Sequence, residues 1–326
     1  MDEPTYKRLI AKAFGKAQKI TNRGTYECLY PNCREVAIKS HSQQRLGALR
    51  SIAEEGLVYS VQRNHYQVMK RLPNTTVMVP TGISEASIFI GFCPDHDRLI
   101  FEPLEKIPLE PSNKKQPFLL LFRSFCYEYA TKRKVRDWTR TLYKEVETFA
   151  SADFLEYLDT TKTARDIFLS RDGVYYFERL FDILNTEDFD QIQIEWKIVD
   201  KNLGVSCSCV LSPLLDTHES YMAEHWNEAQ PLLSFSIVPS SDFTHIVAVW
   251  LSTADPFCQW ARREMSDDIA LESFINRCAF EESEDTCVRP SLWESLSNEE
   301  REAAELAIFP AYMRGAVVRP VNVVKI

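Results

Sequence analysis

The chain has 326 residues, enough for about two domains, and its 45% hydrophobic and 26% charged residues are typical of globular proteins. This composition excludes a disordered protein, a collagen-like protein and a small disulfide-rich protein. The longest apolar runs, residues 118–122 and 246–251, are much shorter than the roughly 18 residues of a transmembrane helix. Residues 1–10 lack the apolar segment of a secretion signal, so we expect a cytoplasmic protein without a membrane partner. Its nine cysteines should then be reduced thiols or metal ligands.

The net charge of −9 is unevenly distributed along the chain. Residues 1–150 carry 24 Lys and Arg against 16 Asp and Glu, whereas residues 151–326 carry 14 against 31. A basic half can attract phosphate groups, while an acidic half repels them. Two interpretations stay open: two domains that neutralise each other across an interface, and an N-terminal half that faces a polyanion such as nucleic acid.

Hydrophobic periodicity predicts the elements of the N-terminal third. Apolar residues three and four apart predict a helix over residues 5–20 and a second helix over 42–55. Strands are expected over 76–79 and 87–90, and a short helix over 97–105.

Three prolines, at positions 108, 111 and 117, make residues 108–117 the best candidate for a linker. We therefore predict one unit of residues 1–107 and a second, acidic unit of residues 118–326.

The second unit is predicted to begin with helices and to continue with strands. Helices are expected over residues 118–149, 154–168, 173–185, 256–280 and 291–307. Short β-branched runs in 191–212 and 231–252 predict strands, and the alternation of apolar with polar residues in 192–198 and 205–210 is typical of half-buried strands. Trp138, Cys207 and Cys209 fit these patterns as core residues. Because the strands cluster instead of alternating with helices, the expected fold class is α+β.

Four residues of the N-terminal third have the chemistry and spacing of a structural zinc site. Cys28 and Cys33 flank one turn, and Cys93 and His96 flank another. Structural zinc takes four Cys or His ligands in a tetrahedron, commonly supplied as two close pairs. A turn pair, a strand and a second pair that opens a helix form the treble-clef arrangement. We therefore predict that these four residues bind zinc, the alternative being that the cysteines are ordinary core residues.

His41 is left over, eight residues after Cys33 and at the end of a short apolar run. This arrangement resembles the zinc-bearing members of the HNH (ββα-metal) endonuclease family, over about residues 24–105. The resemblance implies that His41 is a general base and that Asp97, early in the following helix, helps to hold a catalytic Mg²⁺ or Mn²⁺. It implies phosphodiester hydrolysis. A nuclease-like module joined to an unfamiliar domain also resembles many bacterial genome-defence proteins.

The sequence departs from this family at several positions. Ser40 stands where a metal-binding acid or histidine usually precedes the base, and hard cations prefer carboxylate ligands. The 51 residues between His41 and Cys93 exceed what a compact core needs, and only Asn64 and Asn74 could orient the histidine. Two functions therefore stay open: an HNH-type nuclease, and a non-catalytic zinc-stapled interaction or sensor protein.

Two basic stretches could contact a phosphate backbone. The denser one, which we predict to bind nucleic acid, consists of Lys132, Arg133, Lys134 and Arg136. The other runs along the first helix, where a solvated face is the favoured interpretation; it consists of Lys7, Arg8, Lys12, Lys16 and Lys19. The acidic unit has no recognisable catalytic motif, and His218 and His225 lack the framework of a second metal site. Its partner, a protein or a small molecule, is left open.

Overall fold

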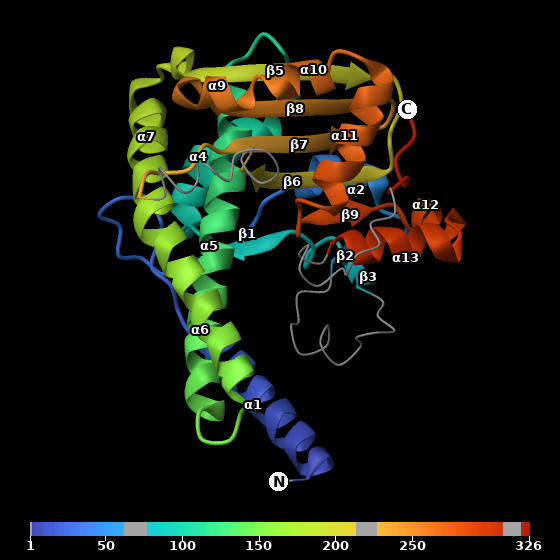
Figure 1. Ribbon diagram of the computed structural model, residues 1–326. Helices are drawn as coiled ribbons and strands as arrows, with labels where there is room; N and C mark the ends of the chain where they lie inside the picture. The colour runs from blue at the N-terminus through green and yellow to red at the C-terminus, as the bar shows by residue number, and fades with distance from the viewer. Residues whose placement is uncertain (1, 62–76, 213–226, 309–320) are drawn as a thin grey trace.

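The computed structural model describes residues 2–61, 77–212, 227–308 and 321–326. Helices and antiparallel strands are both abundant in these ranges, which confirms the α+β class. A large sheet with helices on both faces forms the body of the molecule, and a helical arm projects from it (Figure 1).

The large sheet contains strands from distant parts of the chain. Its order is β3-β2-β9-β6-β7-β8-β5, and neighbouring strands pair antiparallel. The strands are β2 (Leu57–Val61), β3 (Met78–Gly82), β5 (Ile192–Val199), β6 (Val205–Leu211), β7 (Leu233–Pro239), β8 (Thr244–Leu251) and β9 (Thr286–Val288). Because β9 pairs with both β2 and β6, residues 57–82 share a sheet with strands that follow residue 192. The division into units at residues 108–117 stays a prediction.

Helices cover both faces of this sheet (Figure 1). One face packs against α9 (Asp255–Cys258), α10 (Trp260–Glu264), α11 (Asp268–Phe280), α12 (Pro290–Ser295) and α13 (Asn298–Ala307). The other face packs against α4 (Pro94–Lys106), the first half of α5 (Lys115–Val146) and α7 (Gly173–Thr186). Short 3₁₀ turns, η3 (Phe189–Gln191) and η4 (Ser252–Ala254), adjoin the sheet. None of the helices in the described ranges combines the length and apolarity required to span a bilayer.

Strand β8 is an almost continuous apolar run, THIVAVWL. All of its residues are buried, because helices lie on both sides of it. Ile246, Ala248 and Trp250 belong to the core under α11, whereas Val247 and Val249 belong to the core under α5 and α7. Two separate apolar cores therefore meet at one sheet.

The arm consists of α1 (Glu3–Arg23), the second half of α5 and α6 (Ala152–Ile167) (Figure 1). It has a core of its own, in which the Phe14 ring meets the Trp138 ring edge-on at a centroid distance of 5.3 Å. The prediction of Trp138 as a core residue is therefore confirmed. The turn η2 (Phe168–Asp172) continues α6 into α7.

A smaller sheet precedes α4. It pairs β1 (Lys39–His41) antiparallel with β4 (Ile88–Ile90), with His41 opposite Ile88. The chain between these strands contains β2 and β3, so the paired residues of the small sheet are 47 to 51 positions apart.

Three predicted helices differ from the structure. The helix predicted over 291–307 is two helices, α12 and α13, because Ser297 starts α13 with a capping box in which its side chain accepts a hydrogen bond from the Glu300 N–H. Residues 42–55 contain only the π-helical turn η1 (Arg45–Leu49) and α2 (Arg50–Ile52), because the side chains of residues 42–44 are engaged with distant backbone and carboxylate groups. The predicted helix over 256–280 is divided into α9, α10 and α11. Asp267 starts α11 by accepting hydrogen bonds from two backbone N–H groups of its first turn.

Candidate metal centre

The first pair of predicted ligands lies on a tight turn. The N–H of Cys28 donates to Glu35 O at 2.9 Å, and the N–H of Cys33 donates to Tyr30 O at 3.1 Å. Asn32 adopts the left-handed conformation (φ 62°), which asparagine tolerates better than most residues. These bonds hold the two cysteines on the same side of the turn.

The second pair opens α4. Cys93 is the residue that caps this helix and His96 lies in its first turn, with Pro94 at the first helical position, where a missing N–H costs nothing. The Leu29 N–H donates to Gly91 O and the Ile38 N–H donates to Phe92 O, each at 2.8 Å. The two turns are therefore joined through backbone hydrogen bonds on both sides of the cysteines.

These turns bring all four predicted ligand atoms together. The sulfur atoms of Cys28, Cys33 and Cys93 and a ring nitrogen of His96 lie within 4.8 Å of one another. The His96 Nδ1 atom is 3.5 Å from the Cys28 Sγ and 3.2 Å from the Cys93 Sγ. A tetrahedral zinc ion separates its nitrogen and sulfur ligands by about 3.5 Å, so the donor set and its spacing fit zinc.

Comparisons of this chain with protein-family models, curated proteins and solved structures gave no match. The nature of the site therefore rests on its own geometry.

The surroundings of the cluster fix the histidine ring and raise the pKa of the Cys28 thiol. The Tyr30 ring stacks on the His96 ring at a centroid distance of 3.9 Å and an angle of 8°, and it contacts Phe181 of α7 edge-on. Burial raises the pKa of the Cys28 thiol to about 11. At neutral pH this thiol keeps its proton unless a metal ion replaces it, so metal binding releases a proton here.

The two residues predicted to be catalytic lie outside this cluster. His41 ends β1, and its Nε2–H donates to Ile83 O at 3.2 Å, which leaves Nδ1 as the ring atom with a free lone pair. Burial lowers the pKa of His41, which favours the neutral ring. Asp97 lies half-buried in the first turn of α4. Among the described residues, neither belongs to a group of three or more side chains that could hold a second metal ion.

The predicted nucleic-acid-binding residues of α5 make contacts within the protein. Lys132 pairs with Glu128, and Arg136 pairs with Asp137 at 2.8 Å. The Arg133 guanidinium lies over the Tyr26 ring at 4.4 Å and donates to Ile90 O. Lys134 also has a partner. Arg133 thereby ties α5 to β4 and to the chain that leads into Cys28, and a contact of these residues with nucleic acid stays a prediction.

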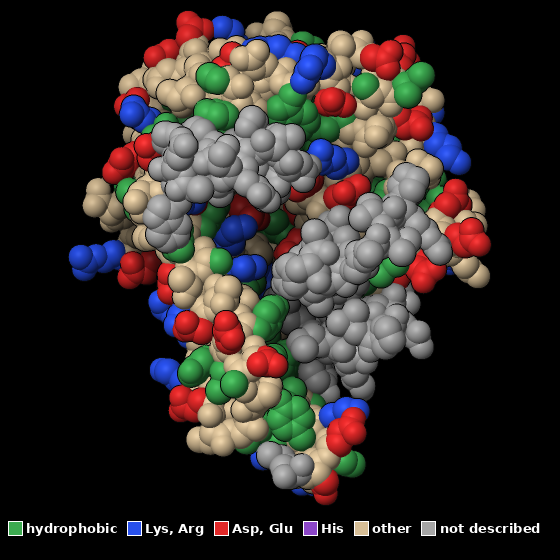
Figure 2. Space-filling model, viewed as in Figure 1, with side chains coloured by type: hydrophobic (Ala, Val, Ile, Leu, Met, Phe, Trp, Pro, Cys, Tyr) green, Lys and Arg blue, Asp and Glu red, His purple; other side chains and the backbone are tan. Residues whose placement is uncertain are grey.

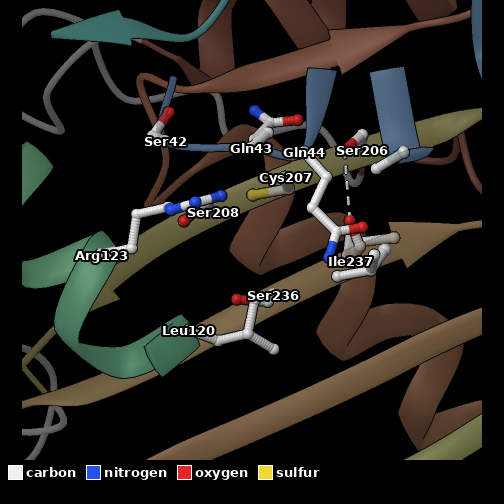
Figure 3. A pocket seen from close by; sticks show the side chains of 12 residues that line it. Ser42, Gln43, Gln44, Leu120, Arg123, Ser206, Cys207, Ser208, Ser236 and Ile237 are labelled. Atoms are coloured by element: carbon white, nitrogen blue, oxygen red, sulfur yellow. Dashed lines mark hydrogen bonds between the residues drawn. The ribbon is translucent and has the colours of Figure 1, made fainter. Parts of the chain in front are cut away.

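A small cavity with both apolar and polar side chains in its lining lies under the segment that follows His41 (Figure 3). Arg123 of α5, Gln43 and Ser236 of β7 line it, and each has one buried polar atom without a hydrogen-bond partner among the described residues. The space of about 10 Å³ suits a single water bound by these atoms. No sequence pattern predicted this cavity, since its lining comes from four separate segments.

The remaining predicted residues cannot be placed. Asn64, Asn74, His218 and His225 lie outside the described residues.

Proposed function

We propose that Cys28, Cys33, Cys93 and His96 bind one zinc ion that holds the N-terminal segment together. The observation that supports this is the convergence of three thiols and an imidazole, from turns 60 residues apart, within 4.8 Å. The ion would act structurally: with four protein ligands it has no open position for a substrate.

We further propose that this zinc-stapled module binds nucleic acid. Its elements follow in the order of a zinc-bearing ββα-metal module: a cysteine turn, β1 ending at His41, β4 and then α4 with the second ligand pair. The excess of Lys and Arg in residues 1–150 favours a phosphate-rich partner.

Hydrolysis of phosphodiesters is a second candidate function, and the position of His41 favours it. A neutral histidine at the end of β1 can act as a base, and Asp97 would hold Mg²⁺ or Mn²⁺. The competing candidate is a non-catalytic interaction or sensor protein, because Ser40 offers no carboxylate to a hard cation.

The zinc site predicts the metal content of the purified protein. Wild-type protein should carry about one zinc per chain, and Cys28→Ser and Cys93→Ser should lose both the metal and most of the folded yield, since structural zinc contributes on the order of 10 kcal/mol to folding. Elemental analysis measures this directly. Cys258→Ala is the matched control, because Cys258 is fully buried but lies outside the cluster. Folded wild-type protein without zinc would end this proposal.

If the protein is a nuclease, substitution of His41 and substitution of a zinc ligand should have different effects. His41→Ala should abolish cleavage of plasmid DNA or RNA with Mg²⁺ or Mn²⁺ and leave the zinc content unchanged, because a general base acts only in the reaction. His96→Ala should instead lose zinc. If wild-type protein binds nucleic acid but cleaves none, the module is a binding module.

A further inference from the structure

The outer face of α1 carries a stripe of cations. Arg8, Lys12, Lys16, Lys19 and Arg23 are spaced four, four, three and four residues apart, so they share one face of the helix. All five are exposed. At 1.5 Å per residue the stripe is about 22 Å long. We call these five residues the α1 stripe.

The stripe faces away from the core of the arm. Ala13, Phe14 and Ala17 are buried on the opposite side of α1 and pack against α5 and α6. The only acidic residue within α1 is Glu3, in its first turn. The helix therefore presents a positive face to solvent along almost its whole length.

Most of the stripe is not neutralised by the protein itself. Lys16 pairs with Glu145 at 2.8 Å. Within the described part of the chain, Arg8, Lys12, Lys19 and Arg23 have no ion pair or hydrogen bond from their side chains. This differs from the basic residues of α5, where Arg136 and Arg140 pair with aspartates. The body of the molecule also differs from the stripe, because acidic and basic side chains are interspersed on the face shown in Figure 2.

We propose that the α1 stripe binds the phosphate backbone of a double-stranded nucleic acid, without reading its sequence. A straight row of cations about 22 Å long matches several successive phosphates of a duplex strand, and such contacts release counterions. Single-stranded partners are usually held by stacking on aromatic side chains. Both aromatic residues of α1, Tyr6 and Phe14, face the arm core, where Tyr6 contacts Phe149 and Phe14 contacts Trp138.

A membrane surface fits the stripe less well than a duplex does. Amphipathic helices bind membranes by inserting an apolar face, and the apolar face of α1 is already buried in the arm. Base reading is also disfavoured, because the Gln18 side chain is half-buried and its amide N–H donates to the Asn22 Oδ1 at 3.1 Å.

The C-terminal end of the stripe is close in the chain to the candidate metal centre. Arg23 lies five residues before Cys28, so at most about 18 Å of chain separates them. The Tyr26 hydroxyl donates to Asp137 at 3.2 Å and Arg133 covers the Tyr26 ring, which fixes this connection on α5. The inference thus deepens the proposed nucleic-acid function, on which it rests, by naming the surface and the form of the nucleic acid.

The test removes the four unpaired charges in the full-length, zinc-loaded protein. The variant Arg8→Gln/Lys12→Gln/Lys19→Gln/Arg23→Gln keeps good helix formers on the exposed face. Binding of a mixed-sequence 20-base-pair duplex is measured by fluorescence anisotropy at several salt concentrations. The affinity at 100 mM salt should fall at least about tenfold, and the slope of log affinity against log salt should become shallower by about 3.6, or 0.9 for each lost phosphate contact.

A second quadruple variant controls for net charge. Arg50→Gln/Arg179→Gln/Lys201→Gln/Arg263→Gln removes four exposed cations outside the arm and should change the slope by less than 1. Zinc content and the circular dichroism spectrum verify folding. If the stripe variant does not fold, the two halves, Arg8→Gln/Lys12→Gln and Lys19→Gln/Arg23→Gln, should each give about half of the slope change.

The other possible results distinguish failure of the α1 stripe from failure of the proposed function. If stripe and control variants bind the duplex equally, the stripe is not the surface, while nucleic-acid binding by the protein survives. Three further probes are compared with the duplex: a 20-nucleotide single strand, polyglutamate, and vesicles with 30% anionic lipid. The inference is overturned if the protein binds any of them more tightly than the duplex. If zinc-loaded wild-type protein binds no nucleic acid at all, both the inference about the α1 stripe and the proposed nucleic-acid function are wrong.

Discussion

At the scale of single residues, burial shifts the pKa of several thiols of this protein. It raises the pKa of the Cys258 thiol to about 12 and that of Cys28 to about 11. Of these two cysteines, however, Cys28 is the one with two other thiols and an imidazole within 4.8 Å. The difference between an inert core cysteine and a candidate ligand is therefore set by the neighbours and not by burial.

His245 should make the stability depend on pH. The Trp196 Nε1–H donates to its Nδ1 at 3.1 Å, and burial lowers the pKa of His245. Between the ordinary histidine pKa, about 6.5, and the lowered value, the unfolded chain binds more protons than the folded chain. This contribution to stability is complete above about pH 6.5 and is lost as the pH falls through the folded pKa.

The variant His245→Phe removes this titration while keeping an aromatic ring beside Trp196 and Phe243. Its free energy of unfolding in urea should change less between pH 7.5 and pH 5.5 than that of the wild type. If the free energy of unfolding of His245→Phe depends on pH as strongly as that of the wild type, groups other than His245 cause the dependence.

At the scale of elements, α4 links the candidate metal centre to the long helix α5. Its first turn supplies Cys93 and His96, and near its end Glu105 pairs with Arg123 of α5 at 2.8 Å. The Arg123 side chain is only 4% exposed and also lies over the Phe101 ring, whereas Glu105 is 35% exposed. If the pair is broken, the Glu105 carboxylate can be hydrated by bulk solvent, whereas the Arg123 guanidinium stays buried.

Glu105→Gln should therefore destabilise the protein by about 2–4 kcal/mol, because it leaves the Arg123 charge buried without a counter-charge. The double variant Glu105→Gln/Arg123→Met should recover part of this loss, because the buried charge is gone. Denaturant unfolding measures both.

Glu102→Gln is the matched control on the same helix. It breaks the exposed pair of Glu102 with Lys106 and should cost only about 0.3–0.5 kcal/mol. Equal effects of the two glutamate substitutions would show that Arg123 does not depend on Glu105.

At the scale of the whole molecule, the sheet joins the two units predicted from the sequence. Strand β2 pairs with β9 through Tyr59–Val288 and Ser60–Cys287, more than 220 residues apart. The Glu54 carboxylate also accepts hydrogen bonds from the backbone and hydroxyl of Ser291 at the start of α12. Without its partner, β2 would expose unpaired backbone groups.

A fragment of residues 1–107 should consequently fail to fold as an independent unit. Expressed alone, it should show no cooperative thermal transition, whereas co-expression with residues 108–326 should yield a soluble complex. Circular dichroism and size-exclusion chromatography provide the readouts. A fragment that binds zinc and unfolds cooperatively alone would instead establish residues 1–107 as a domain.

The sequence by itself determined the local features of this protein. The four candidate ligands could be predicted because each pair lies within one turn, where spacing alone brings the side chains together. The helices α1, α5, α6 and α7 could be predicted because an amphipathic period persists over many residues. Strand β8 was detectable as an apolar run and β7 as part of a short β-branched run, and Cys207 and Cys209 are buried as expected.

Only the tertiary structure decided the features that depend on distant partners. Strand β9 has three residues, too few for a recognisable period, and exists through its pairing with β2 and β6. The cavity at Arg123 depends on which side chains meet in space, and so does the pairing of cations: Lys132 and Arg136 of α5 have acidic partners, whereas most of the α1 stripe has none among the described residues. A spacing rule describes neighbours along the chain, whereas burial and ion pairing depend on contacts that the chain makes after it has folded.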